Sequence, residues 1–381
     1  MQVLLWHAHL ARDSTGETPV PLFQTASEPG KGEKVMKTNL IGTVAGLILL
    51  AAPLGLVAGT WGGQTRQRAQ GKDDYRLEGP FTQGNLTVFL IHGKDRIKGQ
   101  TFITLQEALV QRKVIVRETR SVNSLSIENV SADEVYVQSG DIVKGGAQDR
   151  MLATDLILPP HSGKVPIDAF CVENGRWSKR GQEEVTVFNS SANSVASREV
   201  KLAAKARASQ GEVWKEVSVA QDKLSANTGT RVNGAASPTS FQLALENKAV
   251  QANADNYVKA LSSIADGKPD VIGYVFAING KINSADVYAS SVLFKKLWPK
   301  LLKASAIEAV AELRRGEKFE APKPDAIQGF LDDSPKATEK EKDVSPRVQM
   351  VTRDSDEKVF FETRDRAKSD TWVHRNYIKK N

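Results

Sequence analysis

Residues 140–177 read GDIVKGGAQDRMLATDLILPPHSGKVPIDAFCVENGRW. Two apolar runs, residues 151–158 and 165–172, are joined by the short connection PPHSG, which predicts an antiparallel hairpin. A polar cluster at residues 145–150 precedes the first strand, and another at residues 173–177 follows the second. Because the two strands run a similar distance from the turn, at about 3.4 Å per residue, we expect the two clusters to meet in one site.

The first polar cluster contains Gly145, Gly146, Gln148 and Arg150. Two successive glycines can take positive φ angles, a conformation in which neighbouring backbone N–H groups converge on an anion. A simple bulge or hairpin turn is the alternative explanation for the same two glycines. Gln148 and Arg150 add side-chain donors beside the turn, which makes this cluster a candidate anion-binding loop.

Arg150 and Arg176 belong to different clusters and would face one site if the clusters meet. A guanidinium group binds phosphate or carboxylate through two parallel hydrogen bonds, so both arginines are candidate ligand clamps. The alternative is that they pair with Asp149, Asp155 or Glu173 and lock the loops together. The residues alone leave both interpretations open.

Glu173 follows a strand whose alternate residues form one apolar face, consisting of Val165, Ile167, Ala169 and Cys171. A carboxylate at the edge of such a face suits a general acid or base, which makes Glu173 the candidate catalytic residue. An ion pair with Arg176 or Arg150 is the alternative. Cys171 is expected to be a small buried hydrophobic residue rather than a nucleophile. Trp177 is expected to anchor the sheet, a role compatible with stacking on a ligand.

Hydrophobic patterning predicts an α+β protein. Short alternating strands fill most of residues 81–177 around a capped helix at residues 104–109, which favours a β-sandwich-like or open-barrel portion of antiparallel strands. A helix-rich portion follows, with helical patterns over most of residues 192–265 and over residues 290–314. Residues 271–288 between them predict a hairpin with an Asn-Gly turn.

The predicted domain organisation places one α+β domain at residues 81–314. A polar spacer at residues 61–80 precedes it, and a charged, proline-bearing linker at residues 315–346 follows it. Three strand-like runs in residues 347–381 predict a small C-terminal β meander.

The amino-terminal part has two sections. Residues 1–35 show no helical or strand period, while Met36 and Lys37 precede an apolar run at residues 40–58. This pattern predicts that translation starts at Met36, that residues 1–35 are a mis-called upstream segment, and that residues 36–60 are a cleaved export signal or a membrane anchor. Either way, we expect the globular part to work outside the cytoplasm, as a periplasmic, extracellular or anchored domain.

Composition narrows the function classes. The net charge is +7, but lysine and arginine are dispersed among acidic residues without interleaved aromatics, so nucleic acid is not an expected partner. The single cysteine excludes an intramolecular disulfide and a thiolate zinc site, and the scattered histidines do not predict a metal site. No phosphate-binding loop or nucleophile elbow is present, and we expect no cofactor.

Several motifs resemble a known family. They are TLQEA at residues 104–108, SGDIVKGGAQDR at 139–150, IDAFCVENGRW at 167–177, QGEVW at 210–214 and the segment at 274–302. Together they resemble the ARG-and-rhodanese-phosphatase-superfamily-associated protein domain of the first type, over about residues 81–313. The family takes its name from its association with ADP-ribosylglycohydrolases and rhodanese or phosphatase-like proteins. The resemblance therefore implies a link to ADP-ribose or nucleotide metabolism.

Two hypotheses for function follow from the sequence. The first is a ligand-binding or accessory domain in which Gly145, Gly146, Gln148, Arg150, Arg176 and Trp177 hold an anionic small molecule or a protein partner. The second is a hydrolase-like enzyme that acts on a phosphate-bearing or ADP-ribosyl substrate, with Glu173 as acid/base and Arg150 and Arg176 as charge clamps. The binding hypothesis leads, because one candidate acid/base stands without a second.

Overall fold

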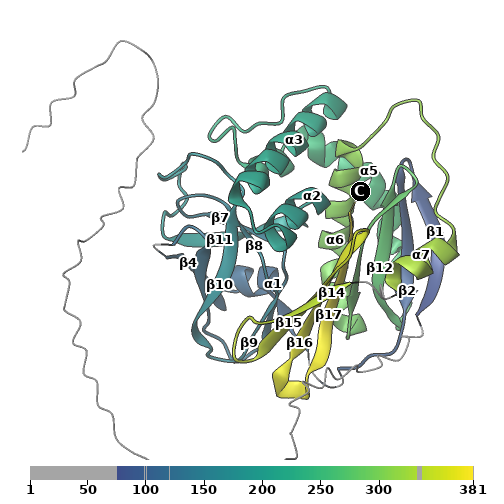
Figure 1. The fold of residues 1–381 in the computed structure, drawn as a ribbon. Helices are drawn as coiled ribbons and strands as arrows, with labels where there is room; N and C mark the ends of the chain where they lie inside the picture. The colour runs from purple at the N-terminus through teal and green to yellow at the C-terminus, as the bar shows by residue number, and fades with distance from the viewer. Residues whose placement is uncertain (1–74, 98, 100, 120, 333–336, 381) are drawn as a thin grey trace, which may run out of the picture. The chain divides into compact units, whose positions relative to one another are not determined.

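The computed structural model describes residues 75–97, 99, 101–119, 121–332 and 337–380, with side chains for all of these except residues 189–193. The upstream segment, the export signal or anchor, and most of the spacer predicted from the sequence lie outside the described residues. The described chain combines helices with antiparallel sheets, which confirms the predicted α+β class (Figure 1).

The largest sheet has eight antiparallel strands in the order β1-β2-β12-β13-β17-β16-β15-β14. The strands are β1 (Arg76–Gln83), β2 (Leu86–His92), β12 (Val271–Ile278), β13 (Lys281–Tyr288), β14 (Thr338–Asp343), β15 (Val348–Asp354), β16 (Lys358–Asp365) and β17 (Thr371–Lys379). Asn279 and Gly280 both take positive φ, as a two-residue turn between β12 and β13 requires. The predicted hairpin is confirmed.

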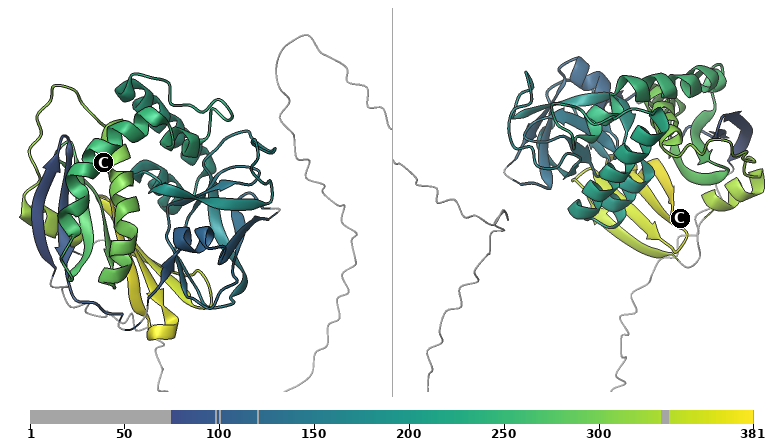
Figure 2. Two further views of the ribbon diagram at one scale, coloured as in Figure 1. Left: turned by 180° about the vertical axis from the view of Figure 1, so that it is seen from behind. Right: turned by 90° about the horizontal axis from the view of Figure 1, so that it is seen from above.

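Helices α5 (Lys248–Leu261) and α6 (Ser291–Ala311) pack against this sheet through β1, β2 and β12 (Figure 2). Each begins at a side-chain cap: Asn247 accepts from the backbone of α5, and Ser290 from that of α6. The cap at Asn247 divides the helix predicted over residues 241–265. The remaining helical segments are α1 (Leu105–Val110), α2 (Arg198–Lys201), the π-helical turn η1 (Leu202–Ala206), α3 (Gln210–Thr228), α4 (Phe241–Leu245), η2 (Ser262–Ala265), α7 (Pro324–Leu331) and η3 (Arg366–Lys368).

A second group of strands closes into a barrel in the order β10-β5-β4-β11-β7-β8. Its strands are β4 (Val114–Glu118), β5 (Ser124–Asn129), β7 (Asp141–Gly145), β8 (Arg150–Leu152), β10 (Gly163–Cys171) and β11 (Val187–Val195). The barrel closes because β11 pairs with both β4 and β7. The expected antiparallel sandwich-like or open-barrel portion is present as a barrel that β11 closes, and part of β11 lies in residues that were predicted to be helical. The remaining described strands form a three-stranded sheet, which consists of β3 (Ile103–Thr104), β6 (Val135–Val137) and β9 (Leu156–Leu158).

The hairpin predicted at residues 151–172 forms only in part. Residues 151–158 are not one strand, because the chain leaves β8 after Leu152 and enters β9, which pairs with β6 in another sheet. The end of β10 pairs with β8 as predicted, in a register that sets Cys171 opposite Arg150, while the start of β10 pairs with β5. The distant ends of the predicted hairpin therefore meet, although its turn does not join paired strands.

The C-terminal strands are not a separate module. β15 to β17 form the predicted meander and β14 adds a fourth strand to it, but β17 also pairs with β13 along residues 284–288, so these four strands are half of the large sheet. The predicted linker contains α7 and β14, and β1 starts within the predicted spacer. The reason is long-range pairing between β13 and β17, which local patterns do not reveal.

In the described part of the chain, no helix is long and apolar enough to cross a membrane. The apolar run at residues 40–58 lies outside that part.

Candidate functional site

The two polar clusters predicted from the sequence lie together. The backbone N–H of Asp149 donates to Glu173 Oε2 at 2.8 Å, and the N–H of Val172 donates to the Asp149 carbonyl oxygen at 2.9 Å. The pairing of Arg150 with Cys171 across β8 and β10 explains this contact. The prediction that both clusters share one location is confirmed.

Glu173 is completely buried and its carboxylate is fully occupied. It accepts from Arg176 Nε at 2.6 Å and Nη2 at 2.8 Å, and from Arg180 Nη1 at 3.3 Å, in addition to the Asp149 amide. The other N–H groups of Arg176 donate to the carbonyl oxygens of Gly145, Gly146 and Ser178. A guanidinium carries five N–H donors, and Arg176 spends all five on this protein. The arrangement matches the loop-locking alternative for Arg176.

Arg180 is the second arginine of this network, and no motif in the sequence singles it out. Its Nη1 and Nη2 each donate to Asp149 at 2.8 Å, and its remaining donors reach Glu173 and Glu183. Burial alone would lower the pKa of Arg180. The hydrogen bonds that Arg180 donates to Asp149, together with the negative charge of Asp149, raise this pKa instead. Ser240 also donates to Asp149, at 2.7 Å. The ring of Asp149, Glu173, Arg176 and Arg180 is therefore a closed buried ion network.

Arg150 and Gln148 lie beside this network inside the barrel wall. Arg150 is 1% exposed and donates from Nη1 to Gln148 Oε1 at 3.1 Å and to Cys171 Sγ at 2.7 Å. Its Nη2 lies 3.4 Å from Glu118. Cys171 is buried, as predicted, and burial raises the pKa of its thiol. These contacts hold Arg150 as a core cation rather than as a group facing solvent.

Gly145 and Gly146 have the backbone conformation expected of them, whereas Trp177 does not have the anchoring role expected of it. Gly145 and Gly146 have φ angles of 116° and 55°, so the positive φ expected of them is confirmed. Their N–H groups donate to Asp149 Oδ1 and to the Glu184 carbonyl rather than converging on one point. Trp177 is 59% exposed and does not anchor the sheet, because the chain has left the strand and Arg176 occupies the interior beside it. That expectation is corrected.

A second buried polar cluster lies where the barrel, η1 and the large sheet meet, and we call it the His374 cluster: Gln138, Ser139, Asp155, Lys201, Lys205, Asp286, His374 and Asn376. His374 Nδ1 is 2.8 Å from Asp155 Oδ2, and its Nε2 is 3.0 Å from Asp286 Oδ1. Burial alone would lower the pKa of His374, but Asp155 and Asp286 raise it. Hydrogen bonds to both carboxylates occupy both ring nitrogens, so His374 serves as a bridging cation and not as a base with a free lone pair.

Lys205 joins this cluster to the surface. It is partly exposed, and its Nζ donates to Ser139 Oγ at 2.9 Å and to Asn376 Oδ1 at 3.0 Å, above the ring of Phe361. Burial, with a further contribution from the charge of Lys201, lowers the pKa of Lys205 to about 8 against the opposing charge of Asp155. The π-helical turn that carries Lys205 is a rare backbone form that is frequent at functional sites.

Lys201 is the least satisfied member of the cluster. Its side chain belongs to a residue that is only 7% exposed, yet no hydrogen bond or ion pair joins it to the described chain. Gly140, at φ 93°, lies so close that an added Cβ would stand 2.9 Å from Lys201 Cε. Two further buried atoms in the same cluster, Asp286 Oδ2 and Gln138 Nε2, also lack partners in the described residues. Buried polar groups are normally paired, so these two unpaired atoms beside Lys201 indicate a place for a ligand.

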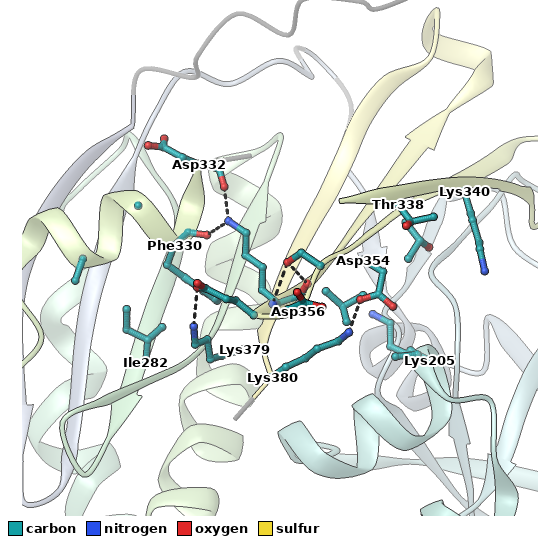
Figure 3. A pocket seen from close by; sticks show the side chains of 18 residues that line it. Lys205, Ile282, Phe330, Asp332, Thr338, Lys340, Asp354, Asp356, Lys379 and Lys380 are labelled. Atoms are coloured by element: carbon teal, nitrogen blue, oxygen red, sulfur yellow. Dashed lines mark hydrogen bonds and ion pairs between the residues drawn. The ribbon is translucent and has the colours of Figure 1, made fainter. Parts of the chain in front are cut away.

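A cleft of about 1020 Å³ opens beside Lys205 (Figure 3). Lys205 reaches it from the η1 side, opposite Phe330 and Asp332 at the end of α7, with Asp354 and Lys380 between them. Lys380 pairs with Asp354, whereas Lys205 forms no ion pair within the residues that the structure describes. Lys205 is therefore the member of the His374 cluster that lines the cleft.

The sequence singles out neither His374, one of five scattered histidines, nor Lys201 and Lys205, which lie in a stretch with a mostly helical pattern. The members of the cluster are spread from residue 138 to residue 376, and no motif spacing connects them. The only local signal is that two lysines stand four apart in a stretch with buried neighbours, Leu202, Ala203 and Ala204. Among the residues that the structure describes, no group of His, Cys, Asp and Glu side chains could hold a metal ion.

Fold and site define an α+β domain in which a closed barrel and a large antiparallel sheet share buried charge clusters. Residues 74–378 match the model of the ARG and Rhodanese-Phosphatase-superfamily-associated Protein domain, and the chain belongs to this family. The match extends past the residues expected from the sequence and takes in the meander, in agreement with the pairing of β17 with β13. No curated protein and no solved structure matches the chain.

Proposed function

We propose that this domain binds a small anionic molecule at Lys205, which lines the cleft, and at Lys201, one helical turn before it. The observation that carries the proposal is Lys201, a residue that is only 7% exposed and whose ammonium group forms no hydrogen bond or ion pair with the described chain. A buried charge without a partner costs several kcal/mol, so a protein keeps one chiefly where function needs it. An anion would supply the missing partner.

The unpaired atoms indicate what kind of anion fits. Lys201, the third N–H of Lys205 and Gln138 Nε2 are donors, while Asp286 Oδ2 is an acceptor. This set suits an anionic group that also carries a hydroxyl, as in a sugar phosphate or a nucleotide. The cleft volume of about 1020 Å³ is at the upper end of the roughly 300–1,000 Å³ of small-molecule sites, which suits a nucleotide-sized ligand. The link to ADP-ribose or nucleotide metabolism that the family's name implies is consistent with this chemistry.

The geometry gives no support to the hydrolase hypothesis with Glu173 as acid/base. Four donors already occupy the carboxylate of Glu173, and the residue has no exposed surface. A general acid or base must come within hydrogen-bond reach of its substrate, which these contacts prevent. The proposal therefore keeps the binding hypothesis and moves the ligand from the arginine network to the lysine pair.

Titration calorimetry of the full chain with pyrophosphate, ribose 5-phosphate and ADP-ribose tests the proposal, with adenosine as an uncharged control. We expect at least one phosphate compound to bind and adenosine not to bind. Lys201→Met should weaken that binding by at least about tenfold, which corresponds to about 1.4 kcal/mol. The matched control Lys215→Met, on the exposed side of α3, should leave it unchanged. Equal binding to Lys201→Met and the parent chain would contradict the proposal.

The same variant has a second readout in the absence of ligand. Because methionine fills similar space and the ammonium group of Lys201 forms no hydrogen bond or ion pair with the described chain, Lys201→Met should lower the free energy of unfolding by no more than about 1 kcal/mol. Urea unfolding measures this change. A larger loss of stability would mean that Lys201 serves the fold, and the ligand proposal would lose its basis.

Location is also part of the proposal. We propose that residues 36–60 direct the domain out of the cytoplasm, on the basis of the basic start and apolar run of that segment. Cell fractionation checks this, and recovery of the chain in the cytoplasmic fraction alone would contradict it.

A further inference from the structure

The Nζ atom of Lys205 has surroundings that suit a neutral amine as well as an ammonium. Its two hydrogen bonds go to uncharged acceptors, Ser139 Oγ and Asn376 Oδ1, and no carboxylate lies within ion-pair distance in the described chain. A neutral amine can donate both of these bonds and still keep its lone pair for a third direction. The cleft lies on that residue's exposed side (Figure 3).

We propose that Lys205 is a reactive amine that forms an imine with an aldehyde or ketone group of a molecule in the cleft. The second lysine supports this assignment. Lys201 stands one helical turn before Lys205, and a neighbouring cation is one of the known ways to activate a lysine toward carbonyl compounds. The inference uses the cleft of the proposed function but does not require that the molecule be an anion.

The lowered pKa of Lys205 agrees with surroundings that suit a neutral amine. Burial and the charge of Lys201 lower the pKa of Lys205 to about 8. At pH 8 about half of the Lys205 side chains would then be neutral, against less than about 1% for a lysine with an ordinary pKa near 10.4. The population of nucleophile at neutral pH is therefore far larger at Lys205 than at exposed lysines.

The step balances with the carbonyl compound as its only co-reactant. The nitrogen lone pair forms a C–N bond to the carbonyl carbon, and the carbonyl π electrons move to oxygen. That oxygen takes up a proton, while the nitrogen releases one to solvent, which gives a carbinolamine. Loss of water, with the oxygen leaving and a second N–H proton released, gives the imine. The net change is amine plus carbonyl to imine plus water, without oxidation or reduction.

Reductive trapping of the full chain tests the inference. The protein is incubated at pH 7.5 with glyceraldehyde 3-phosphate or, separately, with propanal, together with cyanoborohydride, and peptide mass spectrometry locates the alkylated lysines. We expect Lys205 to be modified about ten times faster than Lys215 and the other exposed lysines. Lys201→Met should move the pH midpoint of Lys205 modification upward, because it removes the neighbouring positive charge. The control Lys215→Met should not move it.

The outcomes separate this inference from the proposed function. If Lys205 is modified no faster than the exposed lysines, or if its midpoint is unchanged in Lys201→Met, the imine assignment is wrong. The comparison is made within the parent chain, so it does not depend on a Lys205 variant that folds. Anion binding without selective trapping would overturn the imine and leave the proposed function standing. Selective trapping without anion binding would support the imine and overturn the proposed function.

Discussion

Glu173→Gln should lower the free energy of unfolding by about 3–5 kcal/mol, the cost of removing one partner from a buried ion network. Glu173 receives hydrogen bonds from Arg176, Arg180 and the Asp149 amide, and it is completely buried. The amide of glutamine has the shape of the carboxylate but presents an N–H₂ group to guanidinium donors. Two arginines would thus lose their shared countercharge in a place without water, and the loops after β7 and β10 would separate. Urea unfolding measures the loss.

A matched control lies on β10, the strand that ends two residues before Glu173. Asp168 of β10 pairs with Lys342, but both side chains are about half exposed, so Asp168→Asn should cost no more than about 1 kcal/mol. The contrast between the two variants isolates burial from the loss of a charge. If Glu173→Gln were as stable as the parent chain and lost an activity instead, the catalytic hypothesis for Glu173 would be restored.

His374→Leu should lower the free energy of unfolding by about 3–5 kcal/mol at pH 6, because Asp155 and Asp286 would keep their buried charges without the cation between them. The imidazole lies between these carboxylates and stacks on Tyr288 at 4.6 Å. It therefore ties β9, beside the barrel, to β13 in the large sheet. Leucine keeps part of the packing but neither hydrogen bond.

The same variant should remove a pH dependence. The carboxylates raise the pKa of His374 above its ordinary value of 6.5, so the folded chain holds this proton after the unfolded chain has released it. The stabilisation is complete below pH 6.5 and declines as the pH rises toward the folded-state pKa, at no more than about 1.4 kcal/mol per pH unit. Lys205 acts in the opposite sense from about pH 8 upward, because its folded-state pKa is lowered to about 8. Urea unfolding between pH 6 and pH 8 is therefore the window of choice. An unchanged slope in His374→Leu would contradict the assignment.

Local patterns were enough to predict much of the secondary structure. The capping box of Thr104 and Glu107, the Asn279-Gly280 turn and the strands of the meander all depend on residues close in sequence. Sheet partners were not predictable in this way. β2 pairs with β12, which starts at Val271, and β11 closes the barrel although it overlaps a stretch with helical composition. Pairing over such distances depends on packing that one sequence does not display.

The same contrast between local patterns and long-range contacts applies to the candidate site. The meeting of the Arg150 and Glu173 clusters was predicted from a hairpin that forms only in part, and the pairing of β8 with the end of β10 is what fixes it. The roles of Arg150 and Arg176 were not predictable, because Arg180 and Asp149 decide whether the arginine network is open or closed. The His374 cluster had no local signal. It exists because β13 and β17 pair and because η1 places Lys205 against Ser139.

Lys201 and Lys205 would together hold the anion at the proposed site. A crystal of the full chain soaked with tungstate tests it most directly, because the anomalous signal of tungsten locates the anion without reference to the protein atoms. We expect an anomalous peak within hydrogen-bond distance of Lys201 Nζ and near Lys205, and no such peak in crystals of Lys201→Met. A Lys201 side chain that donates to a protein carboxylate, with tungstate bound only at surface lysines, would contradict the account.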